Sequence, residues 1–115
     1  MTSTTRMLLL GAALVPYVTL VGVDTWMHER ERRVPRLERV LHYTAGMLFL
    51  AFVVAVFRDA AGAALALLAL FVAVAAWDEL GFHRRLDARE RRVHFVSYVA
   101  LALFVGAWRL IGLAA

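Results

Sequence analysis

Residues 24–43, DTWMHERERRVPRLERVLHY, contain a pattern that recurs in residues 79–95, ELGFHRRLDARERRVHF. Both copies read [DE]-x-x-[MF]-H-x-R, then an Arg-rich link, then E-R-x-[LV]-H-[YF], and the second link is three residues shorter. All four histidines of the chain fall in this pattern, each with a carboxylate four residues before it. Residues four apart share one face of a helix. The pattern therefore predicts four helical pairs: Asp24 with His28, Glu38 with His42, Glu79 with His83, and Glu90 with His94.

The segments around the repeated pattern are strongly apolar. Of the 115 residues, 63% are hydrophobic, and the mean hydropathy is +0.71, whereas a soluble domain is nearer half apolar. A membrane-crossing helix needs about 20 apolar residues, and four segments meet this requirement, at about 7–26, 37–57, 60–81 and 91–113. We therefore expect an all-α integral membrane protein with four transmembrane helices in an up-down bundle. It would be a single domain, residues 1–115, made of two parallel helical-hairpin repeats, residues 7–58 and 60–113.

The distribution of charge predicts the orientation in the membrane. All 13 basic residues are arginine, the formal net charge is +4, and ten of the arginines lie in the two repeated segments. The positive-inside rule then places both Arg-rich hairpins in the cytoplasm and both termini outside the plasma (inner) membrane. Because these arginines flank apolar spans and alternate with acids, we expect the lipid bilayer as partner and no nucleic acid. Cysteine is absent, which excludes a disulfide framework and a thiolate metal site.

The direction of the helices gives the eight predicted ligands an order in depth. Helices one and three run toward the hairpins and helices two and four run back, so the ligands fall into two layers. The deeper layer contains Asp24, His42, Glu79 and His94, and the shallower layer contains His28, Glu38, His83 and Glu90. Two imidazoles and two carboxylates are a suitable ligand set for one divalent ion. Nitrogen and oxygen ligands without sulfur favour Zn, Fe or Mn. Because there are two layers, the sequence predicts two such ions.

Three alternatives remain open for these residues. In the first, the carboxylates pair with neighbouring arginines, and the histidines recur only because the segment was duplicated. A haem b would use His42 and His94 as axial ligands. Within the metal hypothesis, Asp78 adjoins Glu79 and would replace it as ligand; the four-residue spacing favours Glu79.

The inward carboxylates and histidines from four helices are similar to the metal sites of soluble ferritin-like di-iron carboxylate bundles. The chain departs from that pattern in its i, i+4 spacing, its four histidines and its membrane setting, so we do not assign it to that family. A binuclear centre predicts a metal-dependent hydrolase or oxidoreductase, with Glu38 or Glu90 as proton acceptor and a small or lipid-soluble substrate. The other candidate functions are a metal transport or sensing subunit and a structural membrane protein, either of them as an oligomer or a single chain.

Overall fold

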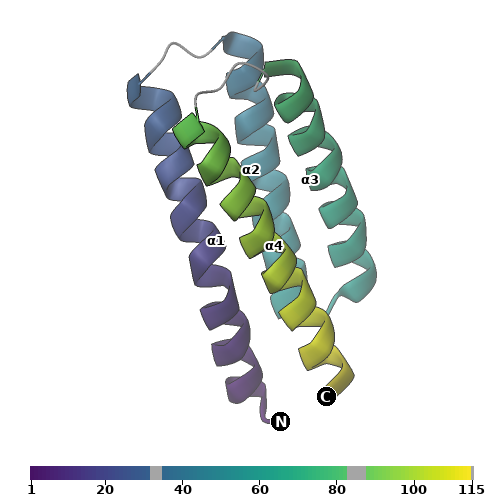
Figure 1. Cartoon of the computed structure of the whole chain (residues 1–115). Coiled ribbons are helices and arrows are strands. Elements are labelled where there is room, and N and C mark those ends of the chain that lie inside the picture. Colours follow the sequence, from purple (N-terminus) through teal and green to yellow (C-terminus); the bar gives the residue numbers. More distant parts are fainter. Residues whose placement is uncertain (32–34, 83–87, 115) are drawn as a thin grey trace. The chain divides into compact units, whose positions relative to one another are not determined.

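The computed structural model describes the backbone of residues 1–31, 35–82 and 88–114, with side chains for all of these except 28–31, 82 and 114. The described residues form four helices, α1 (Ser3–Glu31), α2 (Arg36–Phe57), α3 (Ala61–Phe82) and α4 (Ala88–Ala114), shown in Figure 1. The all-helical prediction is thereby confirmed, and each helix contains one of the apolar segments expected from the sequence.

The helices associate in two pairs. One compact unit comprises Met1–Arg32 and Leu86–Ala115, in which α1 packs against α4, and the other comprises Arg33–Arg85, in which α2 packs against α3. We call them the α1–α4 pair and the α2–α3 pair, and each is described by itself. The two helices of the α1–α4 pair are antiparallel, so the N- and C-termini lie at the same end of that pair (Figure 1). Each pair therefore contains one helix from each half of the chain.

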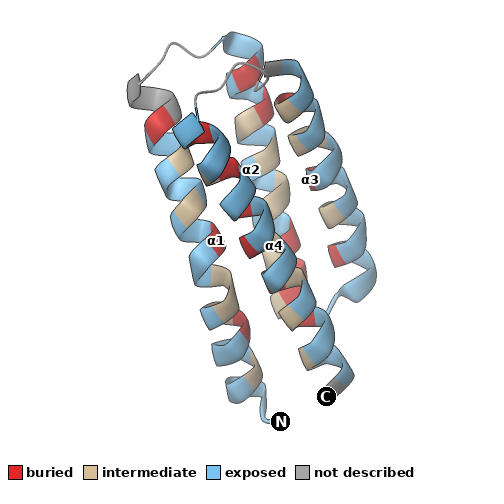
Figure 2. Ribbon diagram, viewed as in Figure 1, coloured by how far each residue is buried: buried red, intermediate tan, exposed pale blue. Residues whose placement is uncertain are grey.

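All four helices are long and apolar enough to cross a membrane, over Ser3–Met27, Arg36–Phe57, Ala61–Gly81 and Ala88–Leu113. Many of their large apolar side chains are exposed, among them Leu8, Leu103 and Leu110, and exposed residues predominate on every helix in Figure 2. Thr19 and Thr44 donate hydrogen bonds to the carbonyl oxygens four residues earlier, at 2.9 and 2.8 Å. This pattern satisfies a hydroxyl without water, as an apolar solvent requires.

A tight link between α2 and α3 makes these two helices antiparallel. The backbone N–H of Ala60 donates to the carbonyl of Ala55 (2.9 Å), and that of Asp59 donates to Val56 (3.3 Å). This pair of bonds is a Schellman motif, in which the residue after the C-cap adopts a left-handed conformation. Asp59 has that conformation, with φ of 60°, and aspartate tolerates it better than most residues other than glycine. Three residues thus suffice to reverse the chain.

Each pair has its own buried apolar side chains. In the α2–α3 pair, Phe52 is fully buried, and the ring of Phe49 lies 5.9 Å from it and 5.5 Å from Phe71, centroid to centroid. In the α1–α4 pair the fully buried side chains include Leu10 and Phe104. The acidic and histidine side chains considered below lie in the last turns of α1 and α3 and the first turns of α2 and α4.

Candidate metal centre

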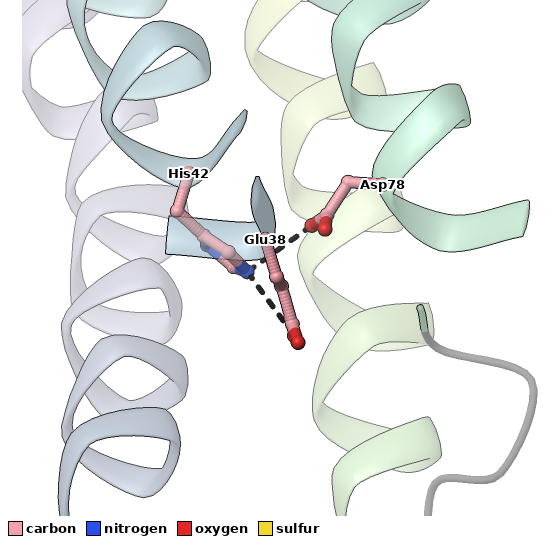
Figure 3. A group of neighbouring side chains, drawn as sticks. All are labelled: Glu38, His42 and Asp78. Atoms are coloured by element: carbon pink, nitrogen blue, oxygen red, sulfur yellow. Dashed lines mark ion pairs between the residues drawn. The ribbon is translucent and has the colours of Figure 1, made fainter. Parts of the chain in front are cut away.

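Glu38, His42 and Asp78 form a compact group in the α2–α3 pair. Nε2 of His42 lies 3.1 Å from Oδ2 of Asp78 and 3.9 Å from Oε1 of Glu38, as Figure 3 shows. One potential ligand atom from each residue lies within 4.8 Å of the other two. Among the residues that the structure describes, these three have ligand atoms close enough together to hold one metal ion.

The spacing of these atoms is suitable for one bound cation. Zinc–nitrogen and zinc–oxygen bonds are about 2.1 Å long, so two ligands at a tetrahedral angle are about 3.4 Å apart. The two distances from His42 Nε2, 3.1 and 3.9 Å, lie on either side of that value. Both distances from His42 Nε2 are therefore close to the spacing of two ligands around one ion, and the third separation, between Glu38 and Asp78, is at most 4.8 Å.

Local structure explains how the group is assembled. Pro35 is the N-cap residue of α2, so Glu38 lies in the first helical turn and His42 one turn later on the same face. A carboxylate is favourable in a first turn because the free N–H groups there carry partial positive charge. Glu38 is nevertheless only 1% exposed, and Asp78 on α3 is 7% exposed. Two buried carboxylates close together repel each other, and a cation between them removes that repulsion.

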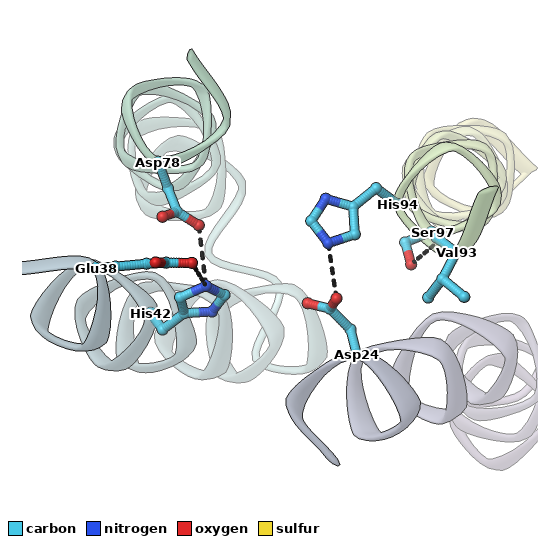
Figure 4. A network of polar contacts seen from close by, with 7 residues as sticks. All are labelled: Asp24, Glu38, His42, Asp78, Val93, His94 and Ser97. Atoms are coloured by element: carbon cyan, nitrogen blue, oxygen red, sulfur yellow. Dashed lines mark hydrogen bonds and ion pairs between the residues drawn. The ribbon is translucent and has the colours of Figure 1, made fainter. Parts of the chain in front are cut away.

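The α1–α4 pair contains a second contact between a histidine and an aspartate. Nε2 of His94 lies 2.7 Å from Oδ1 of Asp24, a hydrogen bond that joins α4 to α1 (Figure 4). Glu90 is buried one helical turn before His94, at 5% exposure. The nearby Ser97 hydroxyl donates to the carbonyl oxygen of Val93 at 2.7 Å, so it is directed toward its own helix.

The structure therefore brings four of the eight predicted ligands into contact within their own pairs, Asp24 with His94 and Glu38 with His42. Glu90 is buried on α4, one turn before His94. Glu79 lies on α3 and is partly buried, but its neighbour Asp78 makes the contact with His42. The contacts thus favour Asp78 for this group. His28 and His83 lie outside the described side chains. The two predicted layers combine residues from both pairs and stay a prediction.

The contacts also bear on the haem hypothesis. An axial histidine directs a ring nitrogen at the iron, whereas Nε2 of His42 and Nε2 of His94 are each directed at an aspartate. The haem alternative would combine His42 and His94 from the two different pairs, and it stays a prediction. Asp78 follows Phe71 by seven residues, and Asp24 follows Tyr17 by the same interval. The sequence contains this spacing, but the burial of Phe71 and Tyr17 that gives it meaning comes from the structure.

Comparison of the chain with family models, curated proteins and solved structures gave no match. The features of the described residues that bear on function are the two His/carboxylate groups and their apolar surroundings.

Proposed function

We propose that the protein is a small integral membrane metalloprotein that binds a divalent cation, Zn²⁺, Fe²⁺ or Mn²⁺, at Glu38, His42 and Asp78. The observation that supports it is the convergence of these three ligands from two helices, 3.1 and 3.9 Å apart at His42 Nε2. Charged groups are costly in an apolar surrounding, by about 2.5–3.5 kcal/mol each at the centre of a membrane-spanning helix and by less toward its ends, where these residues lie. A cation offsets that cost by neutralising the carboxylates and bonding the imidazole.

Three protein ligands leave at least one coordination position for water or a substrate, as in catalytic zinc sites. The chemistry open to such a centre is metal-assisted hydrolysis or, with iron, oxidation of a small or lipid-soluble substrate. A carboxylate that shares the site, such as Glu38, would then accept the proton that a bound water releases.

The hydrogen bond between Asp24 and His94 supports a second candidate function. At 2.7 Å it joins α1 directly to α4, and a polar contact of this kind between transmembrane helices stabilises their association by about 0.6–2 kcal/mol. In this alternative the His/carboxylate groups fasten helices together and bind no ion. Metal content separates the two functions.

We further propose that the protein lies in the plasma membrane with the starts of α2 and α4 in the cytoplasm, because exposed arginines cluster there: Arg36, Arg39, Arg89, Arg91 and Arg92. The chain has no cysteine, so single cysteines can report the orientation. We expect Ala60→Cys, at the exposed α2–α3 link, to react with a membrane-impermeant maleimide added outside intact cells. Ala88→Cys, equally exposed at the start of α4, should react only after permeabilisation. The reverse labelling would contradict this orientation.

The metal proposal is tested by elemental analysis of the purified full chain, made without a polyhistidine tag and compared with two neighbouring variants. Asp78→Asn removes the carboxylate that contacts His42, and we expect it to lose most of the bound metal. Glu79→Gln makes the same change in charge one residue further along α3, and we expect it to retain metal at the wild-type level.

Three results would contradict this assignment. Wild-type protein that holds no stoichiometric metal, even after Zn²⁺, Fe²⁺ or Mn²⁺ is added, would favour the helix-fastening function. If only Glu79→Gln lost metal, the ligand would be Glu79, which the four-residue spacing favours, and not Asp78. A Soret absorption band in the purified protein would establish haem in place of a His/carboxylate centre.

A further inference from the structure

The two helix pairs are built on the same pattern of buried positions. Three positions of α1 recur in α3 54 residues later: Leu10 corresponds to Ala64, Tyr17 to Phe71 and Asp24 to Asp78. Four positions of α2 recur in α4 52 residues later: Glu38 corresponds to Glu90, His42 to His94, Phe52 to Phe104 and Val56 to Trp108. Of these residues, all except Asp24 and His42 are buried, and those two are partly buried. The register places Asp24, Glu90 and His94 at the positions of Asp78, Glu38 and His42.

We propose that Asp24, Glu90 and His94 form a second divalent-cation site in the α1–α4 pair, with lower affinity than the site in the α2–α3 pair. This inference rests on the proposed function and adds to it a site of different strength. It takes the same class of ligand, a divalent cation that prefers nitrogen and oxygen.

Two of the three side chains, Asp24 and His94, are already in contact, whereas among the described residues the 4.8 Å spacing of three ligand atoms is met by Glu38, His42 and Asp78. His94 and Asp24 approach each other from opposite helices, and Glu90 precedes His94 by four residues, as Glu38 precedes His42. Residues four apart on a helix have Cβ atoms about 6 Å apart, so Glu90 would need a change of rotamer to bring its carboxylate to the ring of His94. Glu90 and His94 are 5% and 6% exposed. A cation there would neutralise the nearby carboxylates, as we propose for the α2–α3 pair.

The lower affinity follows from the direct contact between His94 and Asp24. Their atoms are 2.7 Å apart, closer than the roughly 3.4 Å between two ligands of a tetrahedral zinc ion. A cation must therefore break this hydrogen bond before it binds, whereas the 3.1 Å contact of His42 with Asp78 needs little adjustment. The loss of one hydrogen bond to a charged group corresponds to an affinity about tenfold to a hundredfold lower.

The test is a calorimetric titration of metal-stripped, tag-free full chain with Zn²⁺, with stoichiometry checked by equilibrium dialysis and elemental analysis. We expect two ions per chain, the second bound about tenfold to a hundredfold more weakly than the first. His94→Ala and Asp24→Asn should each abolish the weaker binding and leave the tighter one unchanged. Ser97→Ala, which changes a buried residue of α4 outside the site, should bind both ions. Helicity and elution volume establish that each variant is folded.

Each other outcome overturns a definite part of the proposal. One ion in the wild type, with affinity unchanged in His94→Ala, would exclude the second site and leave the proposed function intact. One ion that His94→Ala and His42→Ala both abolish would mean a single shared site. One ion that His94→Ala removes and His42→Ala does not would mean that the α1–α4 pair holds the metal, contrary to the proposed function. Two ions of equal affinity would contradict the prediction that the hydrogen bond between Asp24 and His94 lowers the affinity of the second site.

Discussion

His42→Ala is expected to lower the affinity for the tightly bound cation by more than about a hundredfold, so that the purified variant holds little metal at the α2–α3 pair. Loss of a residue that only orients a ligand already lowers metal affinity about tenfold to a hundredfold, and His42 would be a ligand itself. It also supplies the nitrogen of the group, at 3.1 Å from Asp78 and 3.9 Å from Glu38. Elemental analysis and Zn²⁺ titration measure the effect.

A matched control for this variant is Tyr43→Ala. Tyr43 is the next residue of α2 and is 63% exposed, so the substitution removes an aromatic ring from the same helix without touching the group. We expect it to bind metal as the wild type does. If His42→Ala kept its full complement of tightly bound metal, the assignment of Glu38, His42 and Asp78 as ligands would be wrong.

The four helices could be predicted from the sequence because their signal is local. A run of about 20 apolar residues is sufficient to identify a membrane-crossing helix, and the four such segments lie within the helices of the structure apart from Ala60, which precedes α3. The charged segments between these runs mark where one helix ends and the next begins. Both signals are read along the chain and do not depend on which helix packs against which.

The identity of the acidic partner of His42 could not be predicted in this way, because it depends on contacts between helices. The spacing rule selects Glu79, four residues before His83 on one helix, whereas the structure brings Asp78 to His42 on another. One residue changes the direction of a helical side chain by about 100°, so the two choices face different ways. Only the rotation of α3 about its axis decides between them, and buried Phe71, two turns earlier, indicates that rotation.

A second large effect is expected when the whole group is replaced by apolar residues of similar size, in the triple variant Glu38→Leu, His42→Leu and Asp78→Leu. Replacement of a buried ionic group by hydrophobic residues is often neutral or stabilising by about 1–4 kcal/mol. Glu38 and Asp78 are buried in helices that are mostly apolar. The metal-free triple variant should therefore unfold at the same temperature as metal-free wild type or higher, and it should bind no tight metal.

The single variant His42→Leu provides the contrast, because it leaves two carboxylates buried without the imidazole between them. Removal of one member of a buried ionic group costs about 3–5 kcal/mol, so this variant should be the least stable of the three in thermal unfolding with chelator present. Added Zn²⁺ at a hundredfold excess over its dissociation constant should stabilise the wild type by about 2.7 kcal/mol and leave the triple variant unchanged. If the triple variant were far less stable than metal-free wild type, the three polar residues would be needed to hold α2 against α3. The presence of these charged residues in the α2–α3 pair would then be explained by their part in holding the helices together, and a bound cation would no longer be required to account for it.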